Sequence, residues 1–149
     1  MVALIERLED LPVDRLADLV AASEQEGLRF VRRLAEEWAT GQNRFDRPGE
    51  ALFGALLDTR LVGVCGLNVD PYAGEPTIGR VRHLYVLTAH RGQGVGRGLV
   101  EAVVAAARGA FTTLRLSTGN PAAARLYESL GFRRHAGDTH CTHRLRIAT

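Results

Sequence analysis

The order of apolar runs predicts an α/β (α+β) fold, with about four helices on both faces of a mixed sheet of about seven strands. Short apolar runs of alternating character recur along the chain and are typical of strands. Longer stretches with apolar residues three or four positions apart lie between them and are typical of helices. The length of 149 residues and the hydrophobic content of 46% suit one folded core, so we expect a single domain over residues 1–149.

The first third of the chain predicts one strand, two helices and a loop. Residues 2–8 alternate in side-chain character, which favours a strand. Pro12 is well placed in the first turn of a helix, and Gly27 is a suitable end for that helix. Apolar residues at helical spacing over 30–38 indicate a second, short helix. Residues 40–49 are polar, so we expect a mobile loop there.

The middle of the chain predicts a hairpin followed by a further strand. Apolar runs over 51–57 and 61–69 are joined by a three-residue polar turn, which is the pattern of a β-hairpin. Two glycines in the second run, Gly63 and Gly66, indicate a flat or bulged strand. Residues 78–87 form the next strand-like run.

The last part of the chain predicts two more helices and the remaining strands. Residues 95–108 present a broad apolar stripe, so we expect this helix to pack on the sheet. Asn120 is a suitable helix cap before Pro121, and Gly131 is a suitable end for that helix. Short runs complete the sheet at residues 114–117, 132–135 and 139–147.

One stretch, residues 90–97, carries the clearest functional signal. It reads His-Arg-Gly-Gln-Gly-Val-Gly-Arg between a predicted strand and a predicted helix. Its three glycines leave backbone amides with little side-chain cover and permit positive φ angles that turn amides towards one point. The helix N-terminus adds unpaired amides and the positive end of its dipole. We therefore predict a phosphate-binding turn, flanked by the positive charges of Arg91 and Arg97.

The spacing of these glycines excludes two common phosphate-binding motifs. A dinucleotide fingerprint requires G-x-G-x-x-G, but its third glycine position falls on Arg97 or Leu99 here. The acidic residue that this motif needs about 20 positions downstream is also missing. A Walker loop requires a lysine after its last glycine, and this chain contains no lysine.

The same stretch resembles the acetyl-CoA-binding turn of the GNAT superfamily of N-acetyltransferases, whose pattern is R/Q-x-x-G-x-G/A after an apolar strand. Here Arg91, Gly94 and Gly96 match that pattern. A second family landmark, Asn-Pro-Ala-Ala-Ala-Arg-Leu-Tyr-Glu-Ser-Leu-Gly-Phe at residues 120–132, follows at the expected distance. The resemblance is sharp over residues 81–132 and implies a GNAT-like, mostly antiparallel sheet.

The resemblance implies acetyl-CoA as the acyl-donor substrate, no metal, and direct attack by a primary amine within a ternary complex. The glycine-rich turn would bind the pyrophosphate of CoA, and the preceding strand, which splays from its neighbour in this family, would pair with the pantetheine arm. The implied CoA-binding residues are Leu84, Tyr85, Val86, Arg91, Gly92, Gln93, Gly94, Val95, Gly96, Arg97 and Asn120. For Asn120, the helix cap alone is an alternative explanation.

Tyr127 and His83 are the candidate catalytic residues. By resemblance, Tyr127 matches the tyrosine that hydrogen-bonds the CoA sulfur and protonates the thiolate; a packed core aromatic is the alternative. His83 lies just before the apolar strand end, and an unperturbed imidazole pKa of about 6.5 suits a general base. Glu75 and a structural role for His83 are the alternatives. Some relatives carry a Glu five residues before the matching Asn, but this chain has Arg115 there.

The histidines and cysteines near the C-terminus, and the two cysteines of the chain, predict no further chemistry. His140, Cys141 and His143 contain metal-ligand residue types, but on a strand His140 points away from the other two. We therefore predict no metal site. Cys65 and Cys141 are too few for a disulfide framework and are expected to be separate thiols.

Charge is distributed unevenly along a chain whose formal net charge is +2. Residues 1–75 carry 8 Arg and 14 acidic residues, whereas residues 76–149, with the glycine-rich turn, carry 11 Arg and 3 acidic residues. One hypothesis is that the acidic half attracts a cationic amine; the alternative is that its helices have solvated acidic faces. The arginines are not interleaved with aromatics on one element, so we expect no nucleic-acid partner.

The remaining expectations concern location and partners. No apolar run is long enough to span a bilayer and no signal segment opens the chain, so we expect a cytoplasmic protein without a membrane partner. The acceptor is expected to be a small-molecule or peptide amine, and the family resemblance also admits a homodimer. Two other functions stay open: a non-catalytic acyl-CoA-binding or sensing module, and a transferase that uses another donor such as succinyl- or propionyl-CoA.

Overall fold

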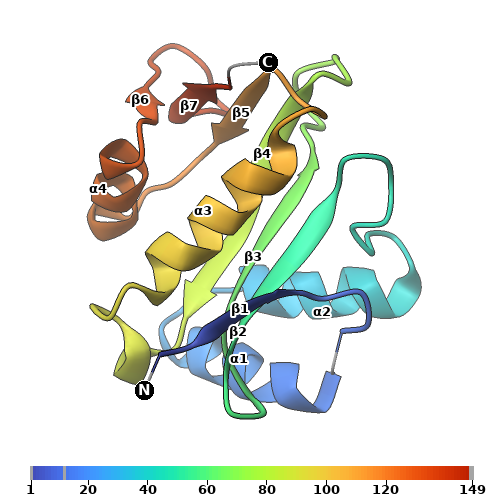
Figure 1. Ribbon diagram of the computed structural model, residues 1–149, viewed down its shortest axis with the longest axis vertical. Helices are drawn as coiled ribbons and strands as arrows, with labels where there is room; N and C mark the ends of the chain where they lie inside the picture. The colour runs from blue at the N-terminus through green and yellow to red at the C-terminus, as the bar shows by residue number, and fades with distance from the viewer. Residues whose placement is uncertain (1, 12, 148–149) are drawn as a thin grey trace.

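The computed structural model describes residues 2–11 and 13–147, and a seven-stranded sheet forms its centre (Figure 1). The strands are β1 (Leu4–Arg7), β2 (Ala51–Leu57), β3 (Arg60–Val69), β4 (Ile78–Val86), β5 (Thr113–Leu116), β6 (Arg133–Arg134) and β7 (His143–Arg146). The helices are α1 (Val13–Gln25), α2 (Phe30–Thr40), α3 (Val95–Ala107) and α4 (Pro121–Ser129), with a short 3-10 turn, η1 (Thr88–His90), before α3. The predicted order of strands and α-helices is confirmed; the predicted helix start at Pro12 lies outside the described residues.

The order of strands across the sheet is β1-β2-β3-β4-β5-β7-β6. All neighbouring strands run antiparallel except β4 and β5, which run parallel. The prediction of a mixed, mostly antiparallel sheet is therefore confirmed. The parallel pair covers only Ile78–Arg80 on β4 and Thr113–Arg115 on β5, so most of β4 has no partner on that side.

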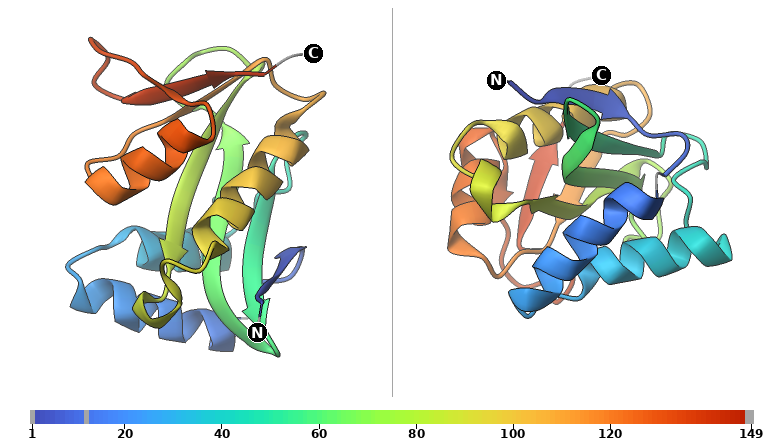
Figure 2. Two further views of the ribbon diagram at one scale, coloured as in Figure 1. Left: turned by 60° about the vertical axis from the view of Figure 1, so that its left-hand side comes forward. Right: turned by 90° about the horizontal axis from the view of Figure 1, so that it is seen from below.

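Helices cover both faces of this sheet, as predicted (Figure 2). Helices α1 and α2 lie on one face, and α3 and α4 lie on the other. The predicted stripe on α3 is buried, because it packs on the central strands β2, β3 and β4. Its buried members include Val95, Leu99, Val103 and Ala107. Within residues 2–11 and 13–147, no helix has the length and apolar character needed to span a bilayer.

The segment between α2 and β2 is packed onto the sheet, which differs from the loose loop that its polar sequence predicts. The side-chain amides of Asn43 and Asn68 exchange two hydrogen bonds of 3.0 Å. The ring of Phe45 is buried and covers Gly66, where an added Cβ would lie 2.5 Å from ring atom Cε1. Polar pairing of the loop with β3 therefore anchors it, and Gly66 makes room for the ring.

The last two strands are shorter than predicted, because side chains hold the connection between them. The carboxylate of Asp138 accepts a hydrogen bond of 2.8 Å from the backbone N–H of His140. The carbonyl oxygen of His140 in turn accepts a hydrogen bond of 2.8 Å from Arg80. These contacts shape a turn where the sequence predicts continuous strand.

Candidate active site

The turn between η1 and α3 has the backbone that its glycines predict. Gly92 and Gly94 have φ angles of 76° and 84°, a region that other residues rarely adopt. Gly94 is the N-cap of α3. Among the described residues, the backbone hydrogen bonds around this turn use only amides before residue 92 or after residue 97. The turn therefore presents a group of unpartnered N–H groups at a helix N-terminus, which is the arrangement that binds phosphate.

The third glycine of the motif serves packing instead of the turn. Gly96 lies inside α3, and an added Cβ there would lie 3.3 Å from Leu126 Cδ2, so Gly96 lets α3 and α4 approach. Val95 is buried beside it. Arg97 is exposed and donates a hydrogen bond of 2.9 Å from Nη2 to Ser129 Oγ. Arg97 therefore keeps its positive charge near the turn while it links α3 to α4.

Arg91, which was predicted to lend charge to a phosphate, is held by a carboxylate. Its Nη1 and Nη2 lie 3.0 and 2.7 Å from the two carboxylate oxygens of Glu26, in the α1–α2 connection. Its Nε donates to the carbonyl oxygen of Val86 at 2.9 Å. The Tyr85 hydroxyl also donates to Glu26. These hydrogen bonds, the Arg91 bond first, lower the pKa of Glu26, so the carboxylate clamps the end of β4 to the α1–α2 connection.

Beyond its pairing with β5, β4 contains a β-bulge. Val64 pairs with Tyr85 and Gly66 pairs with Arg82, so two β4 residues, His83 and Leu84, face the single residue between them on β3. His83 has a φ of 62°, which is uncommon outside glycine but accessible to histidine. The pairing of β4 with β5 ends at Arg80, before this bulge, so Leu84, Tyr85 and Val86 lie along an edge without a β5 partner, where the family resemblance implies the pantetheine arm.

His83 is buried between aromatic rings. The Phe30 ring is roughly parallel to it at a centroid distance of 6.5 Å, and the Phe45 ring meets it edge-on at 6.2 Å. Burial, with a smaller effect from Arg82 and Arg33, lowers the pKa of His83 to about 3. Its Nε2 atom is buried and has no hydrogen-bond partner among the described residues. The imidazole ring is therefore neutral near pH 7, and its low pKa makes it a weak base.

Tyr127 and Asn120 both lie on α4. Tyr127 is only 5% exposed, and its ring contacts Phe132 edge-on at a centroid distance of 5.5 Å. Burial raises the pKa of Tyr127 well above its usual value, so the hydroxyl stays protonated at neutral pH. Asn120 caps α4, because its Oδ1 accepts hydrogen bonds from the N–H groups of Ala122 at 2.9 Å and Ala123 at 3.4 Å. The cap predicted from the sequence is therefore present.

Asn120 also borders a pocket of about 350 Å³. The pocket lies between the β5–α4 connection, the start of α4 and the β6–β7 hairpin, and includes Thr118, Arg134 and Thr142 in its walls. A residue that both caps α4 and lines this pocket is compatible with the two roles expected of Asn120.

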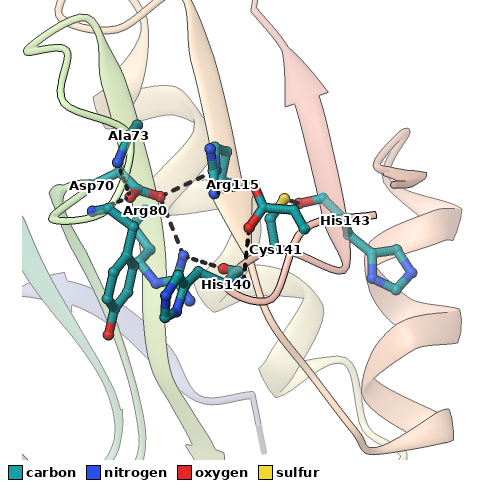
Figure 3. A network of polar contacts seen from close by, with 9 residues as sticks. Asp70, Ala73, Arg80, Arg115, His140, Cys141 and His143 are labelled. Carbon is teal, nitrogen blue, oxygen red and sulfur yellow. Dashed lines mark hydrogen bonds and ion pairs between the residues drawn. The ribbon is translucent and has the colours of Figure 1, made fainter. Parts of the chain in front are cut away.

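The His140, Cys141 and His143 cluster is divided between different contacts (Figure 3). His140 stacks on Tyr72 at a centroid distance of 3.9 Å, whereas His143 Nε2 lies 2.8 Å from Glu128 on α4. Cys141 Sγ donates to the carbonyl oxygen of His143. Within the part of the chain that the structure describes, no group of three His, Cys, Asp or Glu residues could hold a metal ion.

Glu75, the alternative base, and Arg115, which stands where some relatives carry Glu, lie in different surroundings. Glu75 is exposed in the β3–β4 connection. Arg115, at the position where some relatives carry Glu, lies between two carboxylates (Figure 3). Its Nε is 3.4 Å from Asp70 Oδ2 and its Nη2 is 3.0 Å from Asp138 Oδ2. Sequence reasoning missed Asp70, Asp138 and also Glu26, because their partners are distant in the sequence.

Solved acetyltransferases share this fold. A crystal structure from Exiguobacterium sp. 255-15, described as an acetyltransferase, matches 98% of this chain and 94% of its own with a TM-score of 0.87 and 31% identity. The structure of yncA from Salmonella typhimurium, described as an acetyltransferase with its cofactor acetyl-CoA, has a TM-score of 0.71 at 16% identity, covering 99% of this chain and 95% of its own.

The sequence comparison agrees with the fold. Residues 13–132 match the sequence model of the acetyltransferase (GNAT) family, and the chain belongs to this family. A relative named N-alpha-acetyltransferase RimI, from Mycobacterium tuberculosis, is similar in sequence. It is 39% identical over 122 residues, which cover 79% of this chain and 74% of that relative.

Proposed function

We propose that this protein transfers an acetyl group from acetyl-CoA to a primary amine, by direct attack within a ternary complex. The observation that carries this proposal is the group of unpartnered amides at residues 92–97, which follows a strand, β4, whose edge beyond Arg80 has no β5 partner among the described residues. The acetyltransferase relatives support it, as does the acetyl-CoA bound to yncA.

The glycine-rich turn fits the diphosphate of CoA. An added Cβ at Gly92 or Gly94 would meet no atom within 4 Å, so space is open above these residues. The amides of residues 92–97 would bind the phosphate oxygens, and Arg97 would add a positive charge. The backbone of Leu84, Tyr85 and Val86 would pair with the amides of the pantetheine arm, in place of the missing β5 partner.

In the chemical step, the neutral amine attacks the thioester carbonyl carbon. A C–N bond forms, the C–S bond breaks, and the leaving thiolate takes a proton. Tyr127 would donate that proton, since its raised pKa keeps the hydroxyl neutral until the thiolate appears. The amine must also lose a proton, which passes to water, and Nε2 of His83 is the unpartnered group that would accept a hydrogen bond from the amine N–H.

In this role His83 positions the amine and does not act as a general base. With a pKa of about 3, His83 has an available lone pair throughout the working pH range, but it does not keep the proton. It therefore orients the amine rather than setting the pH optimum. Accordingly, we expect the pH dependence of kcat/KM to follow the ionisation of the amine itself.

The test is an acetyl-transfer assay with the purified protein, acetyl-CoA and a panel of primary amines that includes peptides with free α-amino groups. Transfer predicts release of free CoA thiol in equal amount to an acetylated amine detected by mass spectrometry. Thiol release without acetylated amine would indicate hydrolysis. If CoA binds but no thiol forms with any amine, the protein is an acyl-CoA-binding module instead.

A further inference from the structure

Three arginines face the α1–α2 side of the sheet near the place where β4 leaves β5. Arg80 is paired with Arg115 across the parallel strands, and Arg82 lies two residues further along β4, so all three side chains share a face. Asn68 and Gly66, their β3 neighbours, contact the segment that follows α2, which identifies the face.

Two of these arginines are paired with carboxylates, of which Asp70 is buried and Asp138 is partly exposed (Figure 3). Asp70 Oδ2 lies 3.2 Å from Arg80 Nη1 and 3.4 Å from Arg115 Nε, and Arg115 also pairs with Asp138 at 3.0 Å. Asp70 Oδ1 accepts backbone N–H groups from Tyr72 and Ala73. The network therefore contains two positive and two negative charges.

Arg82, the third arginine, is not paired with any carboxylate of the described residues. Among residues 2–11 and 13–147, no hydrogen bond or ion pair holds its guanidinium, although the side chain is half-buried. Burial is the main cause that lowers the pKa of Arg82; among the nearby groups, Glu37 and Tyr72 raise it, while Arg80 and Arg33 lower it. A cation that is partly removed from water without a partner is costly, so an anion beside Arg82 would be stabilising.

The position of Arg82 connects this charge with the reaction. It directly precedes the bulge residue His83, beyond the last β4–β5 pair and beside the open strand edge. His83 Nε2 is buried and, among the described residues, has no hydrogen-bond partner; Arg115 Nε also lacks a hydrogen bond but lies 3.4 Å from the Asp70 carboxylate. One unpaired cation and one unpaired nitrogen acceptor therefore occupy consecutive residues beside the expected thioester.

We propose that the acceptor carries a carboxylate close to its amine, and that Arg82 binds this carboxylate while the amine faces His83. This inference rests on the proposed acetyl transfer and specifies its substrate class. The carboxylate comes from a free amino acid or from an acidic residue at the N-terminus of a peptide. Among the acidic residues near this face, Glu37 of α2 acts on Arg82 and raises its pKa, but no ion pair joins the two side chains within the described residues. The other acids of this region are exposed or already paired: Asp14, Asp18, Glu24 and Glu36 are exposed, and Glu26 is held by Arg91.

The test compares matched acceptors that differ only in the carboxylate. Glycine is paired with glycinamide, and an Asp-Ala-Ala peptide amide is paired with its Asn-Ala-Ala counterpart, with kcat/KM expressed per neutral amine. A lysine-initiated peptide serves as the cationic comparison. We expect one carboxylate acceptor to exceed its amide by about tenfold or more, as for a charge-assisted contact. The pair that shows the difference identifies the source of the carboxylate.

The variants are Arg82→Gln, Arg82→Lys and, as a matched control, Arg108→Gln at the exposed end of α3. Arg82→Gln should abolish the preference, Arg82→Lys should keep part of it, and Arg108→Gln should keep all of it. Melting temperature separates binding from structure: removal of an unpaired, half-buried charge should leave it unchanged or raise it, whereas loss of a structural arginine lowers it.

Three results would overturn the inference: equal rates for carboxylate and amide, a preference for the lysine peptide, or a preference that survives Arg82→Gln. A different set of results would contradict the proposed acetyl transfer itself. If wild-type protein shows no CoA binding by calorimetry and acetylates none of the five acceptors, acetyl transfer itself is wrong. Transfer to neutral amines with no effect of Arg82 rejects only the carboxylate assignment.

Discussion

Replacement of Tyr127 by phenylalanine isolates the proposed proton donor. The ring stays, so its buried contact with Phe132 at 5.5 Å is kept, and only the hydroxyl is lost. The loss of one hydroxyl should change the free energy of unfolding by no more than about 1 kcal/mol. The loss of a general acid should lower kcat by about 100-fold or more, which corresponds to at least about 2.7 kcal/mol in the transition state. The predicted effect on turnover thus exceeds that on folding.

The assay should vary the leaving group as well as the enzyme. Wild-type protein and Tyr127→Phe are compared with acetyl-CoA and with an acetyl thioester of a more acidic thiol. An acidic thiol leaves as a stable thiolate and needs no proton, so the difference between the two proteins should shrink with that donor. Affinity for CoA, measured by calorimetry, should be nearly the same for both proteins.

Two results would refute the role of Tyr127. Wild-type turnover in Tyr127→Phe would remove the hydroxyl from the mechanism. A loss of turnover that is equally large with both thioesters would show that the hydroxyl acts on something other than the leaving sulfur. In that case the packed-aromatic explanation gains support.

Three further predictions concern stability. Asn120→Ala should cost about 1 kcal/mol in chemical denaturation, because two α4 amides lose their acceptor; an unchanged midpoint would contradict the cap. Burial raises the pKa of Cys65 from 9.0 to about 12. The free energy of unfolding should therefore fall as the pH rises from about 9 to 12, by up to about 1.4 kcal/mol per pH unit. Cys65→Ala should make this pH dependence flatter, and the same slope in both proteins would refute the assignment to Cys65. The lowered pKa of His83 predicts the opposite sign, with stability lost as pH falls from 6.5 towards 3. His83→Asn, which tolerates the φ of 62°, should lose less over that window than wild type, and a parallel decline would contradict the burial argument.

Local chemistry explains which parts of the fold could be predicted from the sequence. The Asn120 cap, the helix end at Gly131 and the turn at Gly94 depend on residues within a few positions of one another. Such features follow from capping and φ preferences alone. The apolar stripe of α3 likewise predicts which face of this helix is buried.

The parts that could not be predicted depend on residues far apart in the chain. Glu26 meets Arg91 across 65 positions, and Arg80 binds the carbonyl oxygen of His140 across 60. The positive φ of His83 accompanies the bulge against β3, and the sequence has no glycine at this position that would indicate it. The depressed pKa of His83 follows from rings of α2 and the next loop, which a single-sequence pattern cannot place.

The central claim is that backbone amides at residues 92–97 bind the diphosphate of CoA, and two alanine variants test it. Gly94 and Gly109 have φ angles of 84° and 85°, and an added Cβ at either position meets no atom within 4 Å. The two substitutions therefore carry a similar backbone cost, but only Gly94 belongs to the turn. Calorimetric titration with CoA should give one site in wild type and in Gly109→Ala, and binding weakened by about tenfold or more in Gly94→Ala. No binding to wild type, or equal affinity in all three proteins, would contradict the account.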